Sequence, residues 1–242
     1  MIRIFCTRRV QHVVFLLLTS LSASSLFAQA DTGAYLATVK AELKKTWPNN
    51  RAINLVFHGH SVPAGYFRTP DVRTLEAYPH QVLVALKKQY PTAVINVIVT
   101  AIGGENSVQG EKRFAEEVLV HRPDVIFIDY ALNDRRVGMD QAKIATERMI
   151  RMASEKGIPV ILLTPSPDLT VDLTHQDNVL AQFAAQIRSV AQQYALGLAD
   201  SYDRFESLAL GGVDLKAYMS QSNHPNEKGH ALIAEEILRF FK

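Results

Sequence analysis

The chain has 242 residues, with 26 Lys and Arg against 24 Asp and Glu, a formal net charge of +2 and one cysteine. Charges that balance this closely, with no basic run, argue against nucleic acid or an anionic membrane surface as a partner. A single cysteine cannot form a disulfide within the chain.

The first thirty residues predict a secretory signal peptide. Arg3, Arg8 and Arg9 provide a basic start, residues 13–27 are mainly apolar, and small residues at 28 and 30 form a cleavage site. A membrane anchor is the alternative, but the apolar run is short and a cleavage site follows it at once. We therefore expect cleavage after Ala30, a secreted or periplasmic protein, and no stable membrane insertion after cleavage.

Cleavage changes what the composition implies. It leaves residues 31–242, a length that suits one α/β domain. The removed segment carries three arginines and no acidic residue, which leaves 23 basic against 24 acidic residues. Cys6 is removed as well, so the mature chain is expected to offer no thiolate nucleophile and no cysteine ligand for a metal.

Apolar strands and amphipathic helices alternate along the rest of the chain. Short apolar runs predict strands at 53–57, 93–100, 125–129, 160–164 and 196–199. Helical periodicity predicts helices at 79–90, 113–120, 142–153 and 179–194, with a last helix marked by Ile233, Ile237 and Phe241. Continuously apolar strands separated by helices indicate a parallel sheet covered on both faces, hence a three-layer α/β/α sandwich of about five strands. Residues 65–78 and 201–222 lack periodicity and are expected to be loops over the carboxyl edge of the sheet.

Four polar segments follow these elements in a fixed order. They contain Ser61 after the first strand, Gly104 after the second, Asn133 after the third, and His224 before the last helix. Each alone is an ordinary turn or capping residue. Together they supply a hydroxyl nucleophile, a backbone amide donor, a side-chain amide donor and an imidazole base, which acyl transfer through an oxyanion requires. In a sheet of order 2-1-3-4-5, Ser61 and Asn133 would face one crevice.

This order of segments resembles the SGNH/GDSL hydrolase superfamily along essentially the whole mature chain. Ser61 matches the nucleophile block, Gly104 the glycine block, Asn133 the asparagine block and His224 the histidine block. The resemblance implies a flavodoxin-like fold, ester hydrolysis without a cofactor, and an oxyanion hole made by the Ser61 N–H, the Gly104 N–H and the Asn133 side chain. An exported enzyme of this type implies a small-molecule or glycan ester as substrate, with acetylated carbohydrate favoured.

The triad aspartate of that family is missing from its usual place. It normally lies three residues before the histidine, where this chain has Gln221. A neutral amide cannot supply the charge that stabilises an imidazolium, although it can hold a tautomer. Two arrangements remain open: a Ser-His dyad whose imidazole is oriented by a carbonyl, or an acid from elsewhere, with Asp214 and Glu227 nearest in sequence.

Three alternatives to a serine esterase remain. The absent aspartate motivates a non-catalytic glycan-binding relative, whereas an acyltransferase would use the same residues with a sugar hydroxyl in place of water. A metal-dependent hydrolase would use His58 and His60. This last alternative is the weakest, because two histidines without a clear third ligand do not match typical zinc sites; His58 is expected to pack at the strand end and His60 to shape the pocket beside Ser61.

Overall fold

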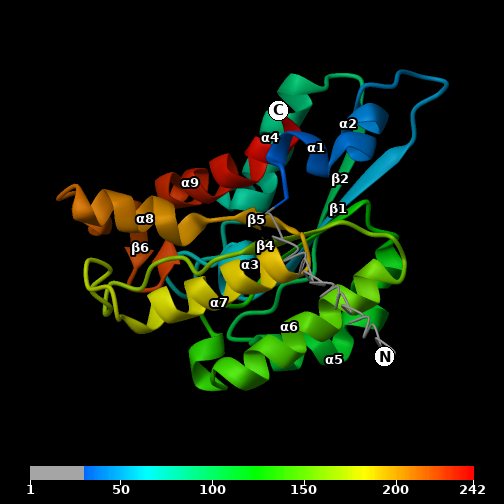
Figure 1. The fold of residues 1–242 in the computed structure, drawn as a ribbon. Helices are drawn as coiled ribbons and strands as arrows, with labels where there is room; N and C mark the ends of the chain where they lie inside the picture. The colour runs from blue at the N-terminus through cyan, green and yellow to red at the C-terminus, as the bar shows by residue number, and fades with distance from the viewer. Residues whose placement is uncertain (1–29) are drawn as a thin grey trace, which may run out of the picture.

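A computed structural model describes residues 30–242, so the predicted signal peptide lies almost wholly outside the described residues. A central sheet lies between two layers of helices, which confirms the predicted α/β/α sandwich (Figure 1). Within residues 30–242, no helix combines the length and the apolar character needed to cross a bilayer.

The central sheet is parallel and has the order β2-β1-β3-β4-β5, as expected from the sequence. All residues of β3 and β4 are buried, because helices cover both faces. The order reverses at β1, which lies between β2 and β3, so the loops after these strands open into one crevice at the carboxyl edge. The strands are Ala52–Gly59 (β1), Val94–Val99 (β2), Val125–Asp129 (β3), Val160–Leu163 (β4) and Gly197–Ala199 (β5).

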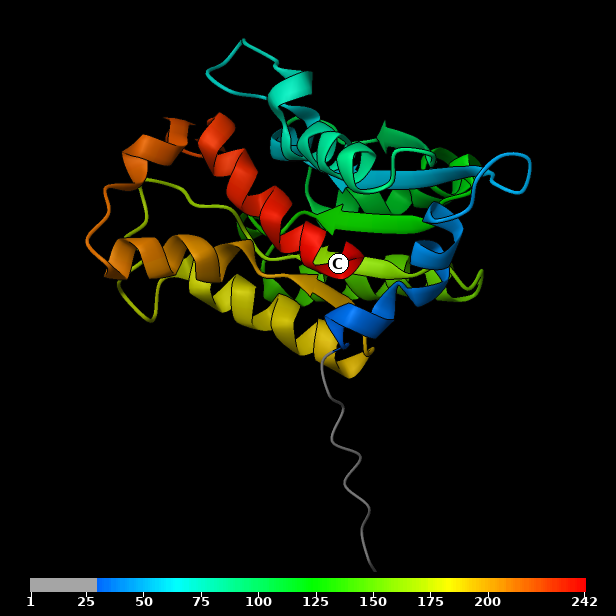
Figure 2. The same ribbon diagram turned by 90° about the horizontal axis from the view of Figure 1, so that it is seen from above.

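Two apolar clusters, one on each face, hold the helices on the sheet. Neighbouring residues of a strand point to opposite faces, so Phe57 belongs to one cluster and Val56 to the other. Helices α1, α2, α4, α8 and α9 cover the first face, where α4 and α9 lie side by side (Figure 2), and α5, α6 and α7 cover the second. Their bounds are Thr32–Tyr35 (α1), Ala37–Leu43 (α2), Tyr78–Gln89 (α4), Ser107–Glu117 (α5), Met139–Ser154 (α6), Val179–Gln193 (α7), Ser201–Leu210 (α8) and Glu227–Leu238 (α9).

Two expectations about the connecting segments are wrong. The first half of 201–222 is helix α8, not loop: Asp200 caps it by accepting from the Asp203 amide, and Tyr202 and Phe205 alone form its fully buried apolar pair. Such a short apolar stripe gives little periodicity. Helix α5 begins six residues before the predicted position, because Asn106 and Gln109 form a capping box ahead of the first apolar turn.

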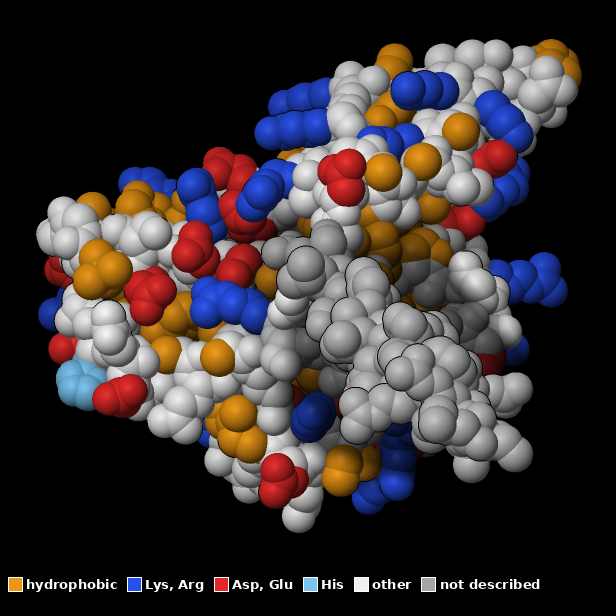
Figure 3. Space-filling model, in the orientation of Figure 1, with side chains coloured by type: hydrophobic (Ala, Val, Ile, Leu, Met, Phe, Trp, Pro, Cys, Tyr) orange, Lys and Arg blue, Asp and Glu red, His pale blue; other side chains and the backbone are white. Residues whose placement is uncertain are grey.

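Three short elements lie at the carboxyl edge of the sheet. Helix α3 (Ser61–Ala64) follows β1, and strands β6 (Met219–Gln221) and β7 (His224–Pro225) form an antiparallel pair just before α9. On the face shown in Figure 3, basic and acidic side chains are interspersed over α8 and α9. The charges over these two helices are therefore mixed.

Candidate active site

Ser61 is the first residue of helix α3, directly past the end of β1. The turn requires glycine at position 59, because a side-chain carbon there would overlap the carbonyl oxygen of Asp129 in the neighbouring strand. The side chain of His60 caps α3 by accepting from the Val62 amide at 3.2 Å. Ser61 is 8 % exposed, so its hydroxyl is held in place yet reaches the crevice.

His224 brings its imidazole to that hydroxyl from the other end of the chain. Its Nε2 lies 2.9 Å from Ser61 Oγ, and its Nδ1 lies 2.8 Å from the backbone carbonyl oxygen of Phe67. A carbonyl can only accept, so Nδ1 carries the proton and Nε2 is free to accept from the serine hydroxyl. This is the tautomer that a general base needs.

Burial sets the charge state of His224. It lowers the pKa of the imidazole below its ordinary value of 6.5, the hydrogen bond to Phe67 opposes that shift, and the nearby His60 adds to it. The ring is therefore neutral at neutral pH and able to take a proton.

Gly104 and Asn133 lie across the crevice from this pair. Gly104 has a φ of +80°, is exposed in the loop between β2 and α5, and borders the crevice. Asn133 follows β3 and donates from Nδ2 to the Glu105 carbonyl oxygen at 2.9 Å. A primary amide has two N–H groups, so one remains for a ligand.

A cavity of about 290 Å³ brings the four predicted residues together. Its wall is mostly polar, apart from the ring of Tyr66, which packs against Gly103. The lining residues are Ser61, Tyr66, Thr69, Gly103, Gly104, Asn133, Arg136, Asn223 and His224.

The two acidic residues that the sequence offers as partners for His224 lie elsewhere and do not contact it. Asp214 caps a short 3₁₀ helix by accepting from the Lys216 amide at 2.9 Å, and Glu227 is an exposed first residue of α9. Gln221 accepts from the Thr69 amide at 3.1 Å and donates to Asn223. Among the described residues no carboxylate contacts His224, and the Phe67 carbonyl holds the position next to Nδ1.

His58 and His60 point into different parts of the molecule. His58 packs edge-on against Phe114 on the side of helix α5, whereas His60 Nε2 faces Asp129 Oδ1 at 3.4 Å, at the end of strand β3. No group of three or more potential ligands that could hold a metal occurs within residues 30–242.

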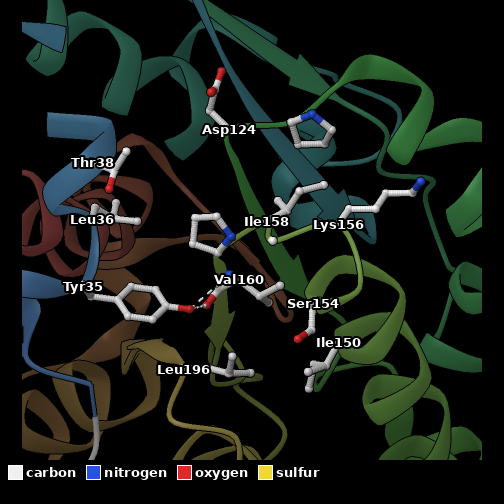
Figure 4. A pocket seen from close by; sticks show the side chains of 13 residues that line it. Tyr35, Leu36, Thr38, Asp124, Ile150, Ser154, Lys156, Ile158, Val160 and Leu196 are labelled. Atoms are coloured by element: carbon white, nitrogen blue, oxygen red, sulfur yellow. Dashed lines mark hydrogen bonds between the residues drawn. The ribbon is translucent and has the colours of Figure 1, made fainter. Parts of the chain in front are cut away.

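A second cavity, of about 490 Å³, lies at the opposite edge of the sheet (Figure 4). It is bordered by Val160 at the start of β4 and by Asp124, which precedes β3. The Tyr35 hydroxyl in its wall is already bound to the backbone of Val160, donating at 2.7 Å and accepting at 3.1 Å. Ligands in folds of this type bind at the carboxyl edge, so the crevice at Ser61 is the candidate active site.

The chain is similar to one known protein family. The GDSL-like lipase/acylhydrolase family model matches residues 57–232, from the end of β1 into α9. No match was found among curated proteins.

Solved structures share the fold. A two-domain esterase active on acetylated mannans, also crystallised with mannopentaose, superposes with a TM-score of 0.70 at 23 % identity, over 87 % of this chain and 54 % of its own. The chain thus spans about half of that protein. An acetylxylan esterase from Geobacillus stearothermophilus has a TM-score of 0.68 at 21 % identity, over 78 % of this chain and 94 % of its own.

Proposed function

Because the chain belongs to the GDSL-like lipase/acylhydrolase family, we propose that it is an exported serine esterase that removes short acyl groups, acetyl above all, from carbohydrate esters. One observation carries the proposal. Ser61 Oγ, His224 Nε2 and the Phe67 carbonyl form a hydrogen-bonded line, and this line opens into the cavity that Gly104 and Asn133 border.

The reaction follows from these positions. Ser61 Oγ attacks the ester carbonyl while its proton passes to His224 Nε2. The oxyanion accepts hydrogen bonds from the Ser61 and Gly104 amides and from the second N–H of Asn133. His224 then gives its proton to the departing sugar oxygen, which leaves an acyl-serine. Water, deprotonated by the same imidazole, hydrolyses this intermediate and returns the hydroxyl to Ser61.

The size and lining of the cavity favour a small acyl group. About 290 Å³ of mostly polar space suits an acetyl group and part of a sugar, whereas a long acyl chain needs apolar walls. Tyr66 offers a ring face for a sugar, and the exposed guanidinium of Arg136 offers donors to hydroxyl groups. Two structural neighbours act on acetylated mannans or xylan, which supports the same class of substrate. A protein exported through its signal peptide would meet such polysaccharides outside the cytoplasm.

The test is covalent labelling of the mature protein. Intact mass after exposure to a fluorophosphonate probe should rise by one adduct, and hydrolysis of 4-nitrophenyl acetate should persist in EDTA. Ser61→Ala should abolish both, with a fall in turnover approaching the about 10⁶ measured for the nucleophile of a serine protease.

Ser222→Ala is the matched control, because Ser222 is exposed two residues before His224. This variant should label and turn over like the wild type. Full activity in Ser61→Ala would refute the mechanism. Binding of acetylated oligosaccharides without labelling or hydrolysis would identify the protein as a glycan-binding relative instead.

A further inference from the structure

Glu105 carries a buried carboxylate directly after Gly104. It is 8 % exposed and accepts hydrogen bonds from the Arg113 guanidinium, at 2.8 Å from Nε and through Nη2, and from the Tyr130 hydroxyl at 2.8 Å. Arg113 lies on helix α5 and Tyr130 directly follows strand β3. A charge at this depth is costly unless it is fully paired, so these contacts fix the loop that bears Gly104.

The backbone of the same residue holds the other amide donor. The Glu105 carbonyl accepts from Asn133 Nδ2 at 2.9 Å. Two residues further on, the Ser107 amide donates to Asp134 Oδ1 at 2.8 Å. Glu105 therefore connects the Gly104 loop and the Asn133 turn, so a shift of its side chain displaces both donors together.

His58, in strand β1, connects this hydrogen-bond network to the sheet. His58 Nε2 lies 3.1 Å from the Tyr130 hydroxyl and 3.2 Å from the Gly110 carbonyl, and Nδ1 lies 2.9 Å from Thr100 Oγ1. Burial, followed by the charge of Arg113, lowers the pKa of His58 to about 3, so the ring is neutral. Position 110 must be glycine, because a side-chain carbon there would overlap the Tyr130 ring.

Together these contacts connect strand β1, strand β3 and helix α5 at one carboxylate. We propose that Glu105 is a positioning residue for the oxyanion hole: clamped by Arg113 and Tyr130, it sets the spacing between the Gly104 amide and the Asn133 amide. This role rests on the proposed esterase function. Glu105 lies behind the donors and does not touch the substrate; it acts by keeping both donors in place before charge develops on the ester oxygen.

Glu105→Gln tests the clamp with little change in size. Arg113 donates to both carboxylate oxygens, so either orientation of the amide turns its NH₂ group towards an N–H of Arg113. One of these donors then loses its partner, and the loop must shift. A misplacement of about 1 Å at reacting groups costs about 100-fold, so kcat should fall by about 10- to 100-fold. KM should change little, because the donors matter most in the transition state.

Glu117→Gln is the matched control. Glu117 binds the same arginine, at 3.0 Å from Nη1, but its side chain is 54 % exposed on the solvent side of α5. The substitution is chemically identical and leaves the buried pair intact, so kcat should stay at the wild-type value. An equal fall in both variants, or wild-type kcat in Glu105→Gln, would overturn the proposal.

Tyr130→Phe provides a second route, which also serves if Glu105→Gln does not fold. It removes the hydroxyl's bond to Glu105, together with its contacts with His58 Nε2 and Arg113, and keeps the ring. Both bonds from Arg113 to Glu105 remain, so it should give a smaller fall in kcat, again at constant KM. Combined with Glu105→Gln it should add little, because both act through one carboxylate. Full additivity, or a wild-type kcat in Tyr130→Phe, would overturn the clamp.

Affinity for a boronic acid, which forms a charged tetrahedral adduct on serine, separates positioning from general destabilisation. At a temperature well below unfolding it should weaken in parallel with kcat, while inhibition by acetate stays constant. Parallel weakening of both inhibitors would indicate a structural role only and would overturn the proposal. Labelling of Ser61 in the wild-type protein tests the esterase function separately. A failure of the esterase proposal can therefore be distinguished from a failure of the Glu105 proposal.

Discussion

Asn133→Ala should separate turnover from binding. One N–H of Asn133 is bound to the Glu105 carbonyl at 2.9 Å, and the other is available to the cavity. Alanine removes both. Loss of one preorganised donor in an oxyanion hole lowers turnover by about 10²–10³, which is about 2.7–4 kcal/mol. KM should change far less, because the neutral ester oxygen of bound substrate interacts weakly with the same donor.

The same substitution has a second, independent cost. It leaves the buried Glu105 carbonyl without its partner, which destabilises the fold by about 1–3 kcal/mol. For a domain of this size, each kcal/mol corresponds to about 2–4 °C in the melting temperature. Kinetics with 4-nitrophenyl acetate should therefore be measured well below the melting temperature of the variant, which thermal unfolding provides.

Asn223→Ala is the control for Asn133→Ala. Asn223 lines the same cavity, and its side-chain oxygen accepts from Gln221. Its loss should cost much less turnover than the loss of Asn133. If Asn133→Ala kept its turnover and raised only KM, the reasoning would be refuted and Asn133 would be a substrate-binding or structural residue.

Two further predictions concern charge. Gln221→Asp should leave turnover within about threefold of wild type, with the acidic limb of the pH–rate profile still below 6.5, because a backbone carbonyl already orients His224. A large gain in turnover, with the acidic limb moved to higher pH, would show that the new carboxylate had replaced the Phe67 carbonyl as the partner of His224. Stability should fall as the pH drops from 6.5 towards 3, because burial holds the pKa of His58 and of His230 at about 3, so only the unfolded chain binds their protons in this range. Asp134, whose pKa is raised by burial to about 6, binds its proton first in the folded state and offsets one of the two. These three groups together leave about 1.4 kcal/mol per pH unit between pH 6 and 4, and the lowered pKa of His224 adds to the loss in the same direction. Thermal unfolding from pH 7 to 4 measures this, and an unchanged melting temperature would contradict it.

The sheet and the meeting of Ser61 with His224 were predictable because each leaves a pattern in the sequence. Five apolar runs separated by helices allow few arrangements, and parallel strands bring their carboxyl ends to one edge. Ser61 and His224 are 163 residues apart in the sequence. Ser61 nevertheless follows β1, which ends at that edge, and His224 precedes α9, which begins there. The order of the strands therefore determined which side chains share the crevice.

Other parts of the site leave no such pattern. The group that orients His224 is a backbone carbonyl, which every residue possesses, so nothing in the sequence singles out Phe67. Glu105 follows two glycines in a predicted turn, where a carboxylate is normally solvated. Only the three-dimensional structure shows that Arg113 and Tyr130 meet there. Contacts between side chains of ordinary type are the part of a site that sequence patterns predict least.

The position of the Phe67 carbonyl is fixed by the segment that begins at Ser61. The Tyr66 amide donates to the Ser61 carbonyl at 3.0 Å, and the Phe67 amide donates to the Asp71 carbonyl at 3.0 Å. The Phe67 ring is buried and stacks on His230 at 5.1 Å. The orienting oxygen is thus fixed six residues from Ser61.

This arrangement separates two tasks that an aspartate performs together. In the serine protease template, an asparagine in place of the aspartate lowers turnover by about 10⁴ because it stabilises the wrong tautomer. The Phe67 carbonyl can only accept, so it enforces the Nδ1–H tautomer of His224 without a charge. What is lost is the attraction between a carboxylate and the imidazolium formed during attack. Burial, unopposed by a carboxylate, keeps the pKa of His224 below its ordinary value, whereas an aspartate beside the imidazole would raise it.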